Sequence, residues 1–258
     1  MMSLLLNLRD IATITRRNFT RLLRTPQLLF FSSVQPIMFL LLFNYVFGGA
    51  VTQAGTGTQS YINFLLPGIL AQTSIFGSLQ TGIGMADDLN KGVIDRFRSL
   101  PMSRSAVVAG RALADASRNV MVLLIMLLVG ELIGFRFNNG IGNGLLALLV
   151  TLLFGFAFSW ISLTIGLLVR DPETAQTSGF VWVFPLVFAS SVFVPTQTMP
   201  DWLRKFAENQ PVTQVVNATR YLMQGIGDSA SVWRTLLWVA GIIIIFVPLA
   251  VYRYRKAV

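Results

Sequence analysis

Long apolar runs alternate with short polar connections along most of the chain. Each run is close to the roughly 20 residues that a helix needs to cross the hydrocarbon core of a bilayer. The composition agrees with this pattern, since 54% of the residues are hydrophobic and only 12% are charged. We therefore predict an all-α integral membrane protein with six transmembrane helices, over residues 28–49, 61–85, 107–135, 145–169, 178–194 and 235–251.

The segment 1–27, before the first apolar run, has the pattern of an amphipathic helix. Apolar residues such as Leu4 and Leu8 recur every three or four positions, whereas arginines such as Arg9 and Arg16 fall roughly on the opposite face. We predict an N-terminal amphipathic interfacial helix that lies along the membrane surface with its arginines near anionic headgroups. Two roles stay open for this helix: it is a basic anchor beside the membrane, or it also binds a partner protein.

The formal charge of +9 is concentrated in three regions of the chain. Arg and Lys gather before the first run, between the second and third runs and after the sixth, whereas 50–60 is uncharged and 135–144 carries only Arg136. This alternation indicates membrane orientation rather than a nucleic-acid partner. The positive-inside rule predicts that both termini are in the cytoplasm. We expect a multi-pass protein of the plasma (inner) membrane. The connection 195–230 is mixed in charge, and we assign it to the outer face.

Several kinds of chemistry are excluded by residues that the sequence lacks. The chain contains no histidine and no cysteine. Zinc, haem and iron–sulfur sites and a Ser-His nucleophile are therefore not expected, and no catalytic or metal site is predicted. No Gly-Lys pair occurs, so the chain has no P-loop for nucleotide phosphates. Any energy for transport must come from another subunit or from an ion gradient.

A charged block between the second and third runs has the features of a docking element. We expect the two acidic residues at its start to occupy the first turn of a helix, a glycine to redirect the chain, and residues 93–100 to form a short helix that a proline ends. The apolar edge of that helix can enter a groove, which a purely solvated loop would not explain. The predicted contact residues are Asp87, Asp88, Gly92, Val93, Asp95, Arg96, Phe97, Arg98, Leu100 and Pro101.

Three charged residues lie on one face at the inner end of the third run. Arg111, Asp115 and Arg118 are spaced i, i+4 and i+3, and this ladder is predicted to hold the helix against its neighbours. Near the other end of the run, Glu131 is interpreted as a residue that reaches the membrane interface, with Arg136 close by.

Two short helices are predicted between the fifth and sixth runs. In residues 199–211, Pro200 is expected at the first helical position and Pro211 ends the segment, and 212–224 are followed by Gly225 and Gly227. Both are too short to span a membrane, so they are expected to be short re-entrant helices before the last span or, equally, interfacial anchors. In the fifth run, Phe180, Phe184 and Phe188 stack on one helix face and either line an apolar pathway or pack against lipid and protein.

The docking block carries a family resemblance. Residues 88–104, DLNKGVIDRFRSLPMSR, resemble the cytoplasmic signature of the permease subunits of type-2 ABC exporters, in particular the daunorubicin-resistance (DrrB-like) branch. Residues 199–211, followed by Arg220 and Gly225, are similar to the family's stretch before the last span. The resemblance covers nearly the whole chain. Many members of the wider family have Glu where Asp87 or Asp88 stands here.

The resemblance implies a single transmembrane domain over 1–258 with a coupling helix in 86–106 and re-entrant helices in 195–230. It also implies two cytoplasmic ATPase subunits, which bind ATP and Mg while this chain binds neither, and a second permease, expected to be an identical copy. Substrate would pass between the permeases near the second and fifth spans, so Gln72 and Gln80 become pathway candidates together with the three phenylalanines.

The function expected from this resemblance is export of amphipathic drugs or lipids from the cytoplasm or inner leaflet. One alternative is a permease for polysaccharide or glycolipid export. Another is an ion-coupled secondary transporter, for which Asp115 and Glu131 are the available acids. A membrane-embedded enzyme is disfavoured, because no paired carboxylates or metal cluster occurs at membrane depth.

Overall fold

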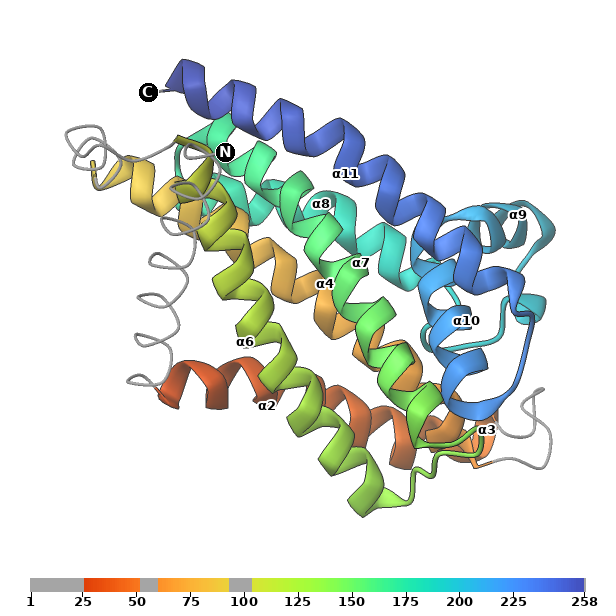
Figure 1. The fold of residues 1–258 in the computed structure, drawn as a ribbon. Helices are drawn as coiled ribbons and strands as arrows, with labels where there is room; N and C mark the ends of the chain where they lie inside the picture. Colours follow the sequence, from red (N-terminus) through yellow and green to blue (C-terminus); the bar gives the residue numbers. More distant parts are fainter. Residues whose placement is uncertain (1–25, 52–59, 93–103, 258) are drawn as a thin grey trace.

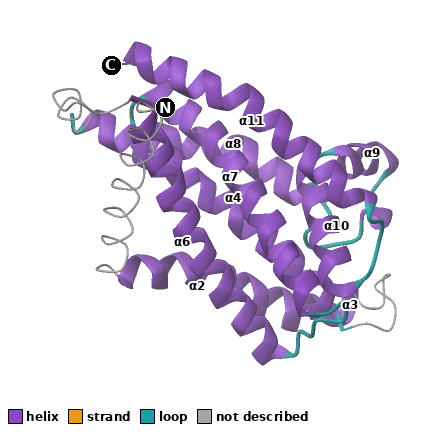
Figure 2. Cartoon of the chain, in the orientation of Figure 1, coloured by secondary structure: helices purple, strands orange, loops and turns teal. Residues whose placement is uncertain are grey.

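The computed structural model describes residues 26–51, 60–92 and 104–257, and every regular element in these ranges is a helix (Figure 2). The predicted interfacial helix therefore lies almost entirely outside the described residues. The first helix, α2 (Pro26–Leu42), begins at a proline and continues through a π-helical turn, η1 (Phe43–Phe47), into α3 (Gly48–Val51). Four long helices follow the predicted runs: α4 (Tyr61–Asn90), α6 (Arg104–Ile133), α7 (Ile141–Val169) and α11 (Ala230–Ala257).

Five of the described helical segments are long and apolar enough to cross a membrane: Phe30–Phe47, Tyr61–Asn90, Val108–Ile133, Ile141–Val169 and Ala230–Tyr254. The fifth predicted run differs from the structure, because α8 (Pro172–Phe188) begins and ends six residues earlier than expected. Asp171 sets the start by accepting hydrogen bonds from the backbone N–H and the hydroxyl of Thr174, and Pro172 occupies the first helical position. These two hydrogen bonds lower the pKa of the Asp171 carboxyl, and the bond from the Thr174 hydroxyl has the larger effect.

Helix α4 is the centre of the bundle, and its most extensive contact is with α7 (Figure 1). The two helices approach so closely that a Cβ atom on Gly166 would lie 2.2 Å from the carbonyl oxygen of Gly82. Ser74 of α4 donates a hydrogen bond to the carbonyl of Thr151 on α7 at 3.0 Å. Small residues allow this backbone approach, which is how helices gain packing energy within a membrane.

The short elements gather at the end of the bundle where α4 begins (Figure 1). There α8 is followed by η3 (Thr196–Thr198), α9 (Asp201–Asn209) and α10 (Pro211–Gln224). Helix α10 starts at Pro211 and ends at Gly225, whose φ of 74° is left-handed, so both predicted short helices are present. Helix α10 packs against α4, α7 and α11 and thus belongs to the bundle rather than to a peripheral loop.

Candidate functional site

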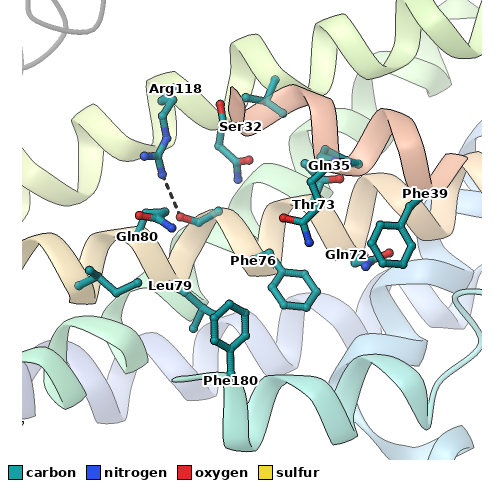
Figure 3. Close-up of a pocket in the computed structure, with 15 residues that line it drawn as sticks. Ser32, Gln35, Phe39, Gln72, Thr73, Phe76, Leu79, Gln80, Arg118 and Phe180 are labelled. Carbon is teal, nitrogen blue, oxygen red and sulfur yellow. Dashed lines mark hydrogen bonds between the residues drawn. The ribbon is translucent and has the colours of Figure 1, made fainter. Parts of the chain in front are cut away.

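A cavity of about 130 Å³ lies between α2, α4, α6 and α8 (Figure 3). Polar and aromatic side chains from all four helices share its wall, although each helix is largely apolar. Its lining consists of Ser32, Gln35, Pro36 and Phe39 of α2, Gln72, Thr73, Phe76, Gly77, Leu79, Gln80 and Ile83 of α4, Arg118, Asn119 and Val122 of α6, and Phe180 of α8.

Both glutamines proposed for the pathway line this cavity, two helical turns apart on α4. Gln72 is 6% exposed, and its Oε1 atom has no hydrogen-bond partner among the described residues. Gln80 is exposed at the same wall and likewise makes no hydrogen bond within the described part of the chain. A buried amide without a partner costs about 1–3 kcal/mol, so Gln72 is well placed to be satisfied by a bound molecule.

Arg118 and Asn119 form the side of the cavity that faces α4. Arg118 reaches from α6, and its Nη2 atom donates a hydrogen bond of 3.0 Å to the carbonyl oxygen of Gly77 (Figure 3). The Nδ2 atom of Asn119 donates to Ser74 Oγ at 2.8 Å. These bonds hold the Arg118 guanidinium and the Asn119 amide at the contact between α4 and α6.

Aromatic rings extend from this cavity along α8. Phe180, Phe184 and Phe188 stack in sequence with ring centroids 5.4 and 5.5 Å apart, as predicted from their spacing. Phe76 on the opposite wall lies 6.0 Å from Phe180.

The same series of rings continues past the end of α8. Phe193 lies 5.3 Å from Phe188 and 4.4 Å from Phe43, and Phe43 lies 5.2 Å from Phe47. We call the rings of Phe76, Phe180, Phe184, Phe188, Phe193, Phe43 and Phe47 the aromatic track. It leads from the cavity to the end of the bundle that holds α9 and α10. Phe184 and Phe188 remain 43% and 45% exposed, so part of the track faces outward from this chain.

A chain of charges joins the cavity to the last turn of α4. Arg118 Nη2 lies 3.7 Å from Asp115 Oδ1, and Asp115 Oδ2 lies 3.8 Å from Arg111 Nε. Arg111 Nη1 pairs in turn with Asp88 of α4. The predicted ladder on α6 is therefore present, and it is anchored to α4 at both ends, through Asp88 and through the carbonyl of Gly77.

The structure corrects the expected placement of the two acidic residues in the docking block. Asp87 and Asp88 lie in the last turn of α4 and not in the first turn of a following helix. The helix continues because the side chain of Asp87 pairs with Lys91 at 2.8 Å and Asp88 pairs with Arg111. Gly92 has φ of 64°, the left-handed conformation that favours glycine. The other predicted contact residues, Val93, Asp95, Arg96, Phe97, Arg98, Leu100 and Pro101, lie outside the described residues.

Sequence reasoning missed contributions to this cavity and to the other end of the bundle. Ser32 and Gln35 interrupt the first apolar run, and this polarity was a signal that one face of α2 lines a cavity. Asn119 follows Arg118 directly and carried the same signal. Arg220, noted only for the family resemblance, is a buried cation at the other end of the bundle.

Comparison with known proteins places these features in a family. Residues 9–223 match the model of the ABC-2 type transporter membrane domain. The chain is 36% identical over 223 residues to the daunorubicin resistance ABC transporter permease protein DrrB1 of Streptomyces coeruleorubidus, covering 86% of this chain and 78% of that protein.

Two further relatives extend this similarity. The chain is 29% identical over 246 residues to a probable doxorubicin resistance ABC transporter permease, DrrC, of Mycobacterium tuberculosis, covering 94% of this chain and 87% of that protein. It is 24% identical over 218 residues to the putative transport permease ycf38 of Porphyra purpurea, which covers 83% of this chain and 74% of the relative.

Proposed function

The chain belongs to the ABC-2 type transporter family, and we propose that it exports amphipathic drugs or lipids as the permease subunit of an ATP-driven complex. The family implies a partner subunit that hydrolyses ATP. The observation that carries the substrate class is the cavity itself, in which amides without partners adjoin phenylalanine rings. Such a wall suits a molecule with a flat or extended apolar body and a few hydrogen-bonding groups.

The finer architecture is part of the proposal. We take α8 as a sixth, short span, because its 17 residues come close to the length that a thinned bilayer accepts. The distribution of basic residues supports cytoplasmic termini, so the end with α9 and α10 faces outward and these helices are re-entrant. A second, identical permease would cover the exposed rings of the aromatic track, and two ATPase subunits with their ATP and Mg would bind the cytoplasmic side.

The charge chain supports a route by which the ATPase acts on the cavity. Asp88 belongs to the docking block, and it is linked through Arg111 and Asp115 to Arg118 in the cavity wall. Movement of the docking block by a closing ATPase would pull on the last turn of α4 and shift α6 relative to α4. The cavity would change shape, and the apolar body of the substrate would move onto the aromatic track.

The experiment that tests this proposal is transport by the reconstituted complex. Vesicles containing the permease and its ATPase partner are given daunorubicin, a fluorescent phospholipid or an oligosaccharide linked to a lipid carrier. We expect ATP-dependent movement of the drug or the phospholipid, and reduced movement for Phe180→Ala. Leu168→Ala, an exposed apolar residue of α7 that lines neither the cavity nor the track, serves as the control. Transport of the oligosaccharide alone would favour the polysaccharide alternative, and transport driven by an ion gradient without ATP would contradict the proposal.

A further inference from the structure

A second cavity, of about 350 Å³, lies at the other end of the bundle, against α10. Its wall combines the start of α4, the segment after α8, helix α10 and the start of α11. None of its lining residues belongs to the first cavity, and the aromatic track approaches it, because Ser191 of its wall lies two residues before Phe193.

The wall of this cavity contains a buried cation, Arg220, that has no counter-ion among the residues the structure describes. Arg220 of α10 is 7% exposed, and among the described residues no carboxylate forms an ion pair with it. Its Nε atom donates to the carbonyl of Phe64 at 2.9 Å, and Nη2 donates to the carbonyls of Ser191 and Val192 at 2.5 and 3.2 Å. The guanidinium carbon also lies 3.5 Å from the centroid of the Phe64 ring.

These contacts stabilise the arginine but leave it charged. Carbonyl dipoles and an aromatic ring offset part of the cost of removing a guanidinium from water, whereas only an anion neutralises it. The Nη1 atom of Arg220 makes no hydrogen bond to any residue in the described ranges, and the side chain lines the cavity. Two N–H donors on Nη1 are thus available to a ligand.

A second buried side chain of the same wall, Gln214, has a hydrogen-bond acceptor that no described residue satisfies. Gln214 is 6% exposed, and its Nε2 atom donates to the carbonyl of Glu208 at 2.6 Å, which fixes the orientation of the amide. Its Oε1 atom, a hydrogen-bond acceptor, has no partner within the described part of the chain. The ligand therefore needs a hydroxyl or another donor group as well as a negative charge.

The rest of the lining supplies mainly donors. Asn63 accepts the backbone N–H of Arg136 through Oδ1, and its Nδ2 makes no hydrogen bond to a described residue. Arg234 adds an exposed guanidinium, and Asp228 uses Oδ1 to accept the backbone N–H of Ala230 at the start of α11. Two arginines against one carboxylate make the cavity electropositive.

We propose that this cavity, between Arg220, Arg234 and Gln214, is a binding site for a phosphate group that carries a hydroxyl donor, such as the headgroup of an anionic glycerophospholipid. Phosphate oxygens accept hydrogen bonds from the donors of Arg220 and Arg234 in the paired geometry that arginine favours. The glycerol hydroxyl of the headgroup donates to Gln214. The site is separate from the cavity of the proposed transport function, and its occupation does not depend on the ATPase.

The test measures lipid binding to the full-length permease with its co-purifying subunits in a mild detergent. Native mass spectrometry compares phosphatidylglycerol with phosphatidylcholine of identical acyl chains, with inorganic phosphate as competitor. The variants are Arg234→Gln, Gln214→Leu and Arg220→Lys. Arg204→Gln is the matched control, because Arg204 lies on the neighbouring α9, already pairs with Glu208 at 2.7 Å and does not line the cavity.

We expect phosphatidylglycerol to bind preferentially. Arg234→Gln should weaken it by roughly tenfold, the loss expected for a charge-assisted hydrogen bond, and Gln214→Leu by roughly two- to tenfold, the loss expected for a neutral one. Arg204→Gln should leave binding unchanged. Displacement by millimolar phosphate would show that the free anion suffices as ligand, and resistance to phosphate would assign the site to the lipid. Equal binding of the two lipids, or unchanged binding in both Arg234→Gln and Gln214→Leu, would overturn the proposal even if Arg220→Lys failed to fold.

Discussion

Replacement of Gln72 by leucine should make the permease more stable and less able to handle its substrate. Gln72 is nearly fully buried in α4, and its Oε1 atom has no hydrogen-bond partner among the described residues. Removing an unsatisfied buried polar group recovers about 1–3 kcal/mol of folding free energy. The same change removes a hydrogen bond to substrate worth about 0.5–1.5 kcal/mol, which corresponds to a roughly two- to tenfold loss of apparent affinity.

The assay combines a measurement on the solubilised permease with one on the reconstituted complex. Thermal unfolding of the detergent-solubilised permease reports stability, and the drug concentration that half-maximally stimulates ATP hydrolysis reports substrate binding. Thr164→Val is the matched control, because this buried threonine of α7 lines no described cavity and its hydroxyl is satisfied by the carbonyl of Trp160 at 2.8 Å. The control should leave the drug response unchanged. A Gln72→Leu variant that is less stable and responds normally to drug would refute the assignment of Gln72 to a substrate-binding wall.

Three further predictions concern the charge chain, helix packing and the cap of α8. Asp115→Asn should lower stability by on the order of 2 kcal/mol, because its ion pairs with Arg111 and Arg118, each of nearly 4 Å, are lost together. Drug-stimulated ATP hydrolysis should fall while basal hydrolysis persists. Unchanged stimulation would contradict this role. Gly166→Ala should lower stability by about 1–3 kcal/mol or prevent folding, because its Cβ would clash with the carbonyl of Gly82, whereas Gly241→Ala meets open space and should be neutral in the same unfolding assay. Since the folded-state pKa of Asp171 is lowered, the stability that it contributes is present above its unfolded pKa of about 3.9 and is lost as pH falls through the folded value. Asp171→Asn should therefore weaken the pH dependence of the melting temperature below pH 5, and an identical pH profile would count against this cap.

The main features of the fold were predictable because they depend on local properties of the chain. Runs of about 20 apolar residues predict spans, and prolines and glycines predict the ends of α9 and α10. The start of α8 was missed because the cap at Asp171 has a greater effect on the helix boundary than hydrophobicity does. The placement of Asp88 was wrong for a related reason, since its partner Arg111 lies on another helix and was not paired with it from sequence.

The candidate sites show where sequence reasoning ends. Gln72 and Gln80 stood out as polar residues in an apolar run, and the structure places both on one cavity wall. Whether the side-chain amides of Gln72 and Gln80 have hydrogen-bond partners depends on how α2, α6 and α8 pack around α4. The surroundings of Arg220 depend on carbonyl acceptors of Phe64 and Ser191, which lie far from it in the sequence, so no local spacing could reveal them.

The most direct test of the central claim is to purify the tagged chain from its native membrane in a mild detergent, identify the co-purifying proteins by mass spectrometry and measure ATP hydrolysis by the complex. We predict equimolar recovery of a P-loop ATPase and hydrolysis that amphipathic drugs or lipids stimulate. Recovery of the intact permease without any nucleotide-hydrolysing partner would contradict the assignment as an ABC exporter subunit.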